Sequence, residues 1–241
     1  FDKSADNGFS KVGDTLTYTL SLSNTSSSDT PPMECLITDG KLGVSKSVTL
    51  ASGQSDTTTV DYTVQAGDDG ATLTNTASVV CSPVGFPNQL RGSDEVTVTL
   101  LHPNFTVAKQ CTNEPVPQDG PATWDVTISN TGDVELVITA DDGIGTFNLL
   151  PGKSQTFPVS QAGPYVGQAS VSNTVSATWT LPGRYNLPNT DTKSDSDTCY
   201  VDGRVDLTKL VGQLPAGTDP YGFTWYFELS GPGIGTITDI A

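Results

Sequence analysis

The chain has 241 residues, with 27 acidic and 11 basic side chains, a net charge of −16, and 58 serines and threonines. The basic residues are scattered, which excludes nucleic acid as a partner, because a polyanion is bound through clustered lysine and arginine. No apolar run reaches the roughly 18 residues of a membrane-spanning helix. The single histidine, His102, lies in what reads as a linker, so we do not expect a histidine triad or a zinc site.

Composition also indicates the fold class. The 24 glycines and 16 prolines supply turns, whereas methionine, lysine and glutamate are too scarce for a helical protein. We therefore expect an all-β protein. The sequence shows no convergent pair of nucleophile and base, so we also expect no enzymatic activity, and we expect no cofactor and no metal.

The sequence repeats itself in chain order. Lys3, Lys109 and Lys209 are each followed by a segment that alternates apolar and polar residues and has an aromatic near its start. These segments are 16–25, 122–131 and 223–229. Strict alternation is typical of a half-buried strand. Further matches place the repeat boundaries near 101/102 and 202/203, so that the repeats cover 1–101, 102–202 and the incomplete 203–241.

Two of these matches concern a turn and a segment that contains an asparagine. The turn Leu50-Ala-Ser-Gly53-Gln-Ser55 matches Leu150-Pro-Gly152-Lys-Ser154, and Asn75-Thr-Ala77 matches Asn173-Thr-Val175. Short strands spaced by turns over about 100 residues predict an immunoglobulin-like sandwich in each full repeat. Short linkers predict that the sandwiches follow one another in a linear array.

The third repeat stops after three strands. The chain also opens inside what reads as a strand, so we interpret it as part of a longer protein. An incomplete sandwich leaves an apolar face uncovered. We expect either that the natural chain continues past Ala241 or that a strand from another molecule completes the unit in a head-to-tail polymer.

An ordered set of motifs carries a family resemblance. The set is Gly13-Asp14-Thr15-Leu16-Thr17-Tyr18, Ser23-Asn24-Thr25, Thr38-Asp39, the Leu-x-x-Gly turn and Asn75-Thr76-Ala77. It resembles the conserved surface repeat called domain of unknown function eleven, and more distantly the B-type domains of pilins and adhesins. Repeat two departs from the pattern at Gly120-Pro121-Ala122.

The resemblance implies an extracellular or cell-surface location and a structural role in a filament, stalk or adhesin. The partners would be other copies or other modules of the same surface protein. Two rival functions stay open: a carbohydrate- or protein-binding module on such an array, and a non-catalytic spacer of a large secreted enzyme.

Alternation also places polar residues on inward faces. Lys3, Lys109 and Lys209 share the phase of their apolar neighbours, and so do Asn75 and Asn173. Asp39 and Asp239 follow the same rule. In repeat two the phase selects Asp142, whereas the family pattern fits Asp141 nearly as well, and both stay open.

Lysine, aspartate and asparagine in an apolar interior permit two interpretations. Desolvation favours a neutral lysine and a protonated aspartate, which are the ingredients of an isopeptide bond between lysine and asparagine. B-type pilin domains form such a bond with the same outline order of residues. The alternative is a buried ion pair between lysine and aspartate, with the asparagine bonded to backbone.

Four cysteines fit an oxidising compartment. Cys35 and Cys81 share the inward phase of repeat one, while Cys111 and Cys199 lie in the first and last strands of repeat two. We therefore predict the disulfides Cys35–Cys81 and Cys111–Cys199. Asn24 and Asn104 match the glycosylation acceptor pattern. We expect 191–197 to form a solvated loop and the tryptophans to pack in the cores.

Overall fold

The computed structural model describes residues 1–188 and 190–203, together with the backbone of two strands, β16 (Asp206–Gly212) and β17 (Thr224–Ser230). The described chain is all-β, apart from a single turn of 3₁₀ helix, η1 (Gly183–Tyr185). It divides into two compact units. Unit 1 comprises Phe1–Asn104, Gly132–Leu136 and Thr180–Thr190, and unit 2 comprises Phe105–Thr131, Val137–Trp179 and Asp191–Ala241. The repeat boundaries remain a prediction from the sequence.

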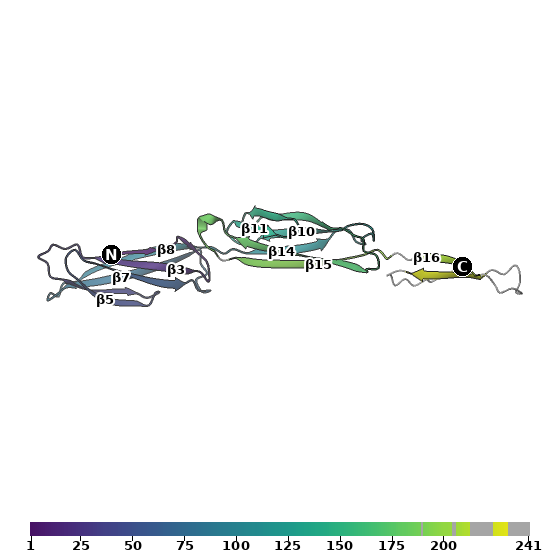
Figure 1. Cartoon of the computed structure of the whole chain (residues 1–241). Coiled ribbons are helices and arrows are strands. Elements are labelled where there is room, and N and C mark those ends of the chain that lie inside the picture. Colours follow the sequence, from purple (N-terminus) through teal and green to yellow (C-terminus); the bar gives the residue numbers. More distant parts are fainter. Residues whose placement is uncertain (189, 204–205, 213–223, 231–241) are drawn as a thin grey trace. The chain divides into compact units, whose positions relative to one another are not determined.

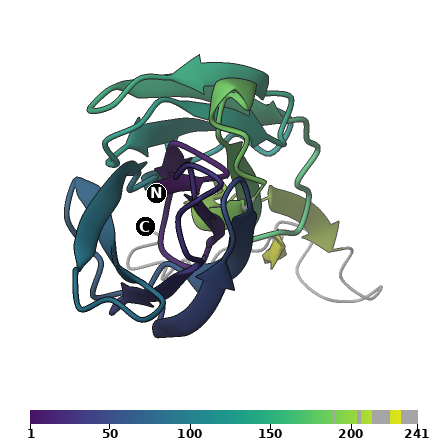
Figure 2. The same ribbon diagram turned by 90° about the vertical axis from the view of Figure 1, so that its left-hand side faces the viewer.

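Unit 1 contains two sheets (Figure 1). The three-stranded sheet has the order β1 (Asp2–Ala5), β3 (Thr15–Ser23), β6 (Ser55–Thr63). The five-stranded sheet has the order β2 (Phe9–Ser10), β8 (Leu90–Leu100), β7 (Thr72–Pro83), β4 (Met33–Asp39), β5 (Val44–Leu50). Figure 2 shows these strands, purple to blue, arranged around a common interior.

Unit 2 has the same plan. One sheet has the order β13 (Ser154–Gln161), β10 (Ala122–Asn130), β9 (Phe105–Cys111). The other has the order β12 (Gly145–Leu149), β11 (Leu136–Ala140), β14 (Ser170–Thr180), β15 (Asp191–Tyr200). Each of these seven strands therefore has a counterpart in unit 1 with the same neighbours. The place of β2, which pairs in parallel with β8, is taken in unit 2 by a single parallel bridge between Val116 and Val201.

Alternation explains the cores. In β3 the side chains of Leu16, Tyr18, Leu20 and Leu22 are buried, and the residues between them are more exposed. In β10, Trp124, Val126 and Ile128 are fully buried in the same way. Burying each such side chain stabilises the fold by roughly 1.5–3 kcal/mol. The expectation of core tryptophans holds for Trp124 and for Trp179, which is 5% exposed; the side chain of Trp225 lies outside the described residues.

The Leu-x-x-Gly turns are built alike, with one correction to the sequence match. In unit 1 the turn joins β5 to β6, with Leu50 buried and Gly53 at φ +77°. In unit 2 it joins β12 to β13, and Gly152 has φ +69°. The buried leucine there is Leu149, not Leu150, which is 55% exposed. The match was wrong by one position because leucine occupies both.

A second correction concerns 191–197. These residues belong to the ten-residue strand β15 instead of forming a solvated loop. Their Asp-Ser alternation concealed a strand because acidic residues disfavour strands in general. The third repeat is described only in part: β16 and β17 form an antiparallel pair in which Lys209 lies opposite Phe227.

Candidate functional site

Unit 1 holds a buried cluster of Lys3, Asp39 and Asn75 between its two sheets. Lys3 lies on β1 in the three-stranded sheet, while Asp39 ends β4 and Asn75 lies on β7 in the five-stranded sheet. Each has the inward phase of its strand, as the alternation predicted. The structure thus brings together three residues that are far apart in the sequence.

One oxygen atom connects the cluster. Asp39 Oδ2 accepts a hydrogen bond from Lys3 Nζ at 2.5 Å and another from Asn75 Nδ2 at 3.2 Å. The second oxygen, Oδ1, accepts the backbone N–H of Leu42 at 3.0 Å, which fixes the carboxylate at the start of the following turn. The side chains of Lys3 and Asp39 have no exposed surface, and Asn75 is 3% exposed.

The surroundings of the lysine are apolar and aromatic. Lys3 Nζ lies 5.1 Å from the centre of the Tyr18 ring, and Ala77 next to Asn75 on the same face of β7 is fully buried. Burial lowers the pKa of Lys3, although the Asp39 carboxylate acts in the opposite direction. An ammonium removed from water is costly, so burial shifts Lys3 toward its neutral amine.

Unit 2 reproduces only part of the cluster. Lys109 Nζ contacts Asp142 Oδ2 at 2.7 Å and lies 5.3 Å from the centre of the Trp124 ring. Asp141 points elsewhere, since its Oδ1 accepts the backbone N–H of Ser176 on β14. Among the described residues, Asn173 has no hydrogen bond to either Lys109 or Asp142. Asp142, which the phase selected, is therefore the partner of Lys109.

The difference follows from where the acid sits. Asp39 is the last residue of β4 and points into the core, whereas the same position on β11 is held by Ala140. The acid of unit 2 comes two residues later, in a turn, where Asp142 adopts φ +53°. Its side chain reaches Lys109 from the edge and stays 22% exposed. An acid placed there bonds the lysine without bonding the asparagine.

Carboxylates on the last strands hold the first strands, a role that sequence reasoning missed. Asp94 on β8 accepts the backbone N–H of Lys3 at 2.7 Å. In unit 2, Asp195 accepts that of Lys109 at 2.8 Å, and Asp197 accepts that of Cys111 at 2.6 Å. The repeated acid in the last strand of each repeat was the available signal.

The structure contains the two disulfides expected from the sequence. Cys35 and Cys81 are directly opposite each other on β4 and β7, within one sheet. Cys111 on β9 and Cys199 on β15 belong to different sheets. Unit 2 is therefore cross-linked between its first and last strands, while the disulfide of unit 1 leaves the first strand, β1, untouched.

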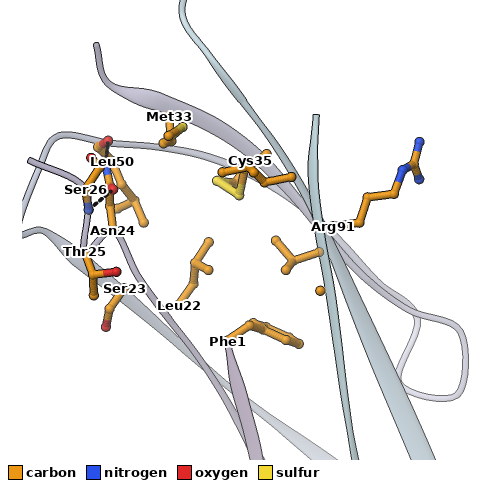
Figure 3. Close-up of a pocket in the computed structure, with 14 residues that line it drawn as sticks. Phe1, Leu22, Ser23, Asn24, Thr25, Ser26, Met33, Cys35, Leu50 and Arg91 are labelled. Carbon is orange, nitrogen blue, oxygen red and sulfur yellow. Dashed lines mark hydrogen bonds between the residues drawn. A yellow bond between two sulfur atoms is a disulfide. The ribbon is translucent and has the colours of Figure 1, made fainter. Parts of the chain in front are cut away.

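A cavity of about 370 Å³ opens beside the first disulfide (Figure 3). Its walls are largely apolar, and Phe1 and Leu22 face its interior. Asn24, at its rim, accepts the backbone N–H of Ser26. The cavity contains no cluster of ionisable groups, and the described part of the chain has no group of three or more His, Cys, Asp or Glu that could hold a metal ion.

The remaining predicted positions are the two possible glycosylation sites and the polar residues of the third repeat. Asn24 is 8% exposed and donates its Nδ2 to the carbonyl of Leu50, so the atom that would carry a glycan is engaged. Asn104 is exposed. The side chain of Lys209 and the whole of Asp239 lie outside the described residues. Within the described residues, no helix is long and apolar enough to cross a membrane.

Neither a protein-family model nor a curated protein matches the chain. Among solved structures it is similar to a protein of unknown function from Porphyromonas gingivalis W83, with 12% identity and a TM-score of 0.33, over 83% of this chain and 97% of that one. It is also similar to trypsin-activated alpha-2-macroglobulin from Escherichia coli, with 12% identity and a TM-score of 0.29, over 90% and 19%. A third is the transglutaminase of red sea bream, with 11% identity and a TM-score of 0.28, over 83% and 31%. The chain spans less than a third of the last two. Likenesses this weak support no activity for the chain.

Proposed function

We propose that this chain is a structural repeat module of an extracellular filament, stalk or adhesin. The main support for the proposal is that two all-β units share the same order of strands in their sheets and that each unit contains its own disulfide. Disulfides persist in oxidising compartments outside the cytosol. A repeated, separately cross-linked sandwich suits a protein whose work is to span distance.

The outer faces of the sheets support the same role. Hydroxyl groups on neighbouring strands pair across them, as in Thr74 with Thr97 at 2.9 Å and Thr127 with Thr156 at 2.9 Å. With a net charge of −16, such a surface stays soluble and disfavours non-specific association. The proposed partners are other modules or copies of the same surface protein, arranged in a linear array.

The rival functions have weaker support. A sugar-binding platform needs several exposed aromatic rings. Trp124 and Trp179 are buried in the cores, and the exposed rings of Phe86 and Tyr200 belong to different units. A spacer in a secreted enzyme would have the same sandwich, and only the rest of such a protein distinguishes it.

Immunogold labelling of the producing cells, with an antibody raised against this chain, tests the proposal. We expect gold particles on the cell surface or along fibres in negatively stained material. Labelling confined to the cell interior would refute the extracellular role. Surface labelling together with strong, selective binding on a glycan array would favour the binding module instead.

A further inference from the structure

We propose that the loop of residues 84–90, which leads from β7 into β8 in unit 1 (the first tip), is a docking surface for a second copy of the chain. The second copy meets it with an edge of its unit 2 formed by Glu114, Pro115 and Tyr200. This inference rests on the proposed function for the kind of partner, and it names the contact by which one copy follows another.

The first tip has a counterpart of the same construction. The loop of residues 181–188, between β14 and β15, is the second tip. In the first tip the N–H of Phe86 donates to the carbonyl of Pro83 at 3.0 Å, and in the second the N–H of Tyr185 donates to the carbonyl of Pro182 at 3.1 Å. The two aromatic residues therefore have the same place in their hairpins, three positions after a proline.

The second tip shows what such a loop binds. Residues Thr180–Thr190 belong to unit 1, where the ring of Tyr185 meets the ring of Phe9 on β2 edge-on, with the ring centres 4.9 Å apart and the planes at 86°. The side-chain amide of Asn7 donates to the carbonyl of Tyr185 at 3.0 Å. Edge-to-face packing is a favourable arrangement of aromatic rings. The aromatic residue of this tip thus packs on β2 and on the residues just before it.

The first tip is exposed. Phe86 is 58% exposed and Leu90 is 59% exposed, and Val84 is exposed as well. Apolar side chains gathered on a surface mark a site of interaction. Arg91 follows Leu90, and its side chain points away from the nearby cavity (Figure 3). The first tip is therefore apolar with a positive charge beside it.

Unit 2 has an edge that corresponds to β2. The parallel bridge between Val116 and Val201 takes the place of β2, so that Pro115, one residue earlier, corresponds to Phe9. Pro115 is exposed. Tyr200, whose carbonyl accepts the N–H of Val116 at 2.8 Å, is 66% exposed. An exposed proline and an exposed aromatic ring thus stand where the second tip binds in unit 1.

Charge favours this pairing of surfaces. Glu114 and Asp202 are exposed on the edge of unit 2, and Glu114 Oε1 accepts the N–H of Tyr200 at 2.9 Å. A net charge of −16 opposes contact between copies in general, whereas Arg91 beside the first tip complements this acidic edge. Because the tip and the edge are different surfaces, a copy bound through one can still bind through the other, and association continues head to tail.

Sedimentation velocity of the full chain, at a series of protein concentrations, tests the proposal. We expect the average sedimentation coefficient to rise with concentration, since a small contact gives a weak complex. Phe86→Ser and Tyr200→Ser should each abolish the rise. The control is Leu150→Ser, which changes a residue of similar exposure, 55%, outside both surfaces. All three positions are exposed, and equal thermal unfolding midpoints verify that the variants fold.

Cysteine cross-linking identifies the two surfaces directly. All four native cysteines are in disulfides, so an added cysteine is the free thiol of its chain. We expect an oxidised mixture of the Phe86→Cys and Tyr200→Cys variants to give a disulfide between positions 86 and 200 of different copies. Peptide mapping without reduction detects this bond.

Three results would overturn the proposal. A sedimentation coefficient that does not change with concentration means that the copies do not associate. A rise that persists in Phe86→Ser or Tyr200→Ser places the contact elsewhere, as completion of the third repeat by a strand would. Linked pairs of Phe86→Cys alone, with none in the mixture between positions 86 and 200, mean that two tips meet each other. Gold on the cell surface together with any of these results would refute the docking and leave the proposed function standing.

Discussion

Asn24 and Asn130 occupy the same place in the two units. Asn24 donates its side-chain amide to the carbonyl of Leu50 at 2.9 Å, and Asn130 donates its own to Leu149 at 2.8 Å. The backbone carbonyl of Asn24 also accepts the N–H of the turn glycine Gly53, and that of Asn130 accepts the N–H of Gly152. These bonds connect the end of β3 to the turn between β5 and β6, and the end of β10 to the turn between β12 and β13. The repeat motif Ser-Asn-Thr has a structural purpose in both units.

We expect Asn24→Ala and Asn130→Ala each to lower the free energy of unfolding of their own unit by roughly 1–3 kcal/mol. The reason is that a buried carbonyl loses its donor. Urea unfolding followed by tryptophan and tyrosine fluorescence measures the change. The control is Asn88→Ala, at an exposed position, with an expected change within about 0.5 kcal/mol. Equal effects at all three positions would contradict the bridging role.

Removing the disulfides should have unequal effects. The separation of the linked cysteines is 88 residues in unit 2 and 46 in unit 1. Each bond is expected to contribute ~2–4 kcal/mol by restricting the unfolded chain, and the longer loop about 0.6 kcal/mol more. Thermal unfolding of the Cys111→Ala/Cys199→Ala and Cys35→Ala/Cys81→Ala double variants compares them. A larger loss in the second pair would argue against the chain-entropy account.

Asp68 makes unit 1 sensitive to acid. Hydrogen bonds from Lys41 at 2.8 Å and Tyr62 at 2.6 Å lower the pKa of Asp68 from 3.8 to about 2. A carboxylate with a lowered folded pKa stabilises the protein above its unfolded pKa, and this contribution is lost as the pH falls toward 2. Because Lys41 is partly exposed, we expect only ~1 kcal/mol.

The Asp68→Asn variant should therefore be less stable than the parent at pH 7 and lose less stability between pH 4 and pH 2. Urea unfolding at a series of pH values gives both quantities. Asp69→Asn is the matched control, since it removes the neighbouring charge of the same turn. Parallel pH profiles for the parent and Asp68→Asn would show that the hydrogen bonds contribute nothing.

Gly132 has no room for a side chain. A Cβ atom built there would lie 2.4 Å from the carbonyl oxygen of His102 and 2.5 Å from the backbone nitrogen of Asn104. Because backbone cannot yield as a flexible side chain does, Gly132→Ala should destabilise unit 1 by roughly 1–3 kcal/mol. Gly67→Ala, where nothing lies within 4 Å, is the control. Thermal unfolding distinguishes the two, and similar midpoints would mean that 102–104 can shift.

Much of the fold could be predicted from the sequence because the signal was local. Alternation over two residues identified β3 and β10, and the same rule placed Lys3, Asp39 and Asn75 on inward faces before any distance was known. In repeat two the phase favoured Asp142, but the family pattern kept Asp141 open, and the contact with Lys109 decided between them. Phase fixes the face of a strand, and for short strands in a sandwich the face largely decides which side chains can meet.

The phase of a residue does not predict which group its side chain contacts. Asn173 has the inward phase of Asn75, yet Asp142, the acid that contacts Lys109, lies in a turn, two residues past the end of β11. Two carboxylates on β15 were read as solvated because their partners are backbone N–H groups on β9, which carry no sequence signal. Contacts to backbone depend on how the sheet edges approach each other, and that is set by the whole unit.

The position of the second disulfide has a mechanical consequence. If β9 and β15 are pulled apart, the load passes from Cys111 to Cys199 through the sulfur atoms, and the chain between them stays slack. That chain spans 88 residues, so the bond withholds about 300 Å of extension at ~3.3–3.6 Å per residue. In unit 1 the 46-residue separation of Cys35 and Cys81 withholds about 150 Å. Under tension, the segment from Cys111 to Cys199 would therefore keep its length, whereas in unit 1 the residues before Cys35 and after Cys81 could still be extended.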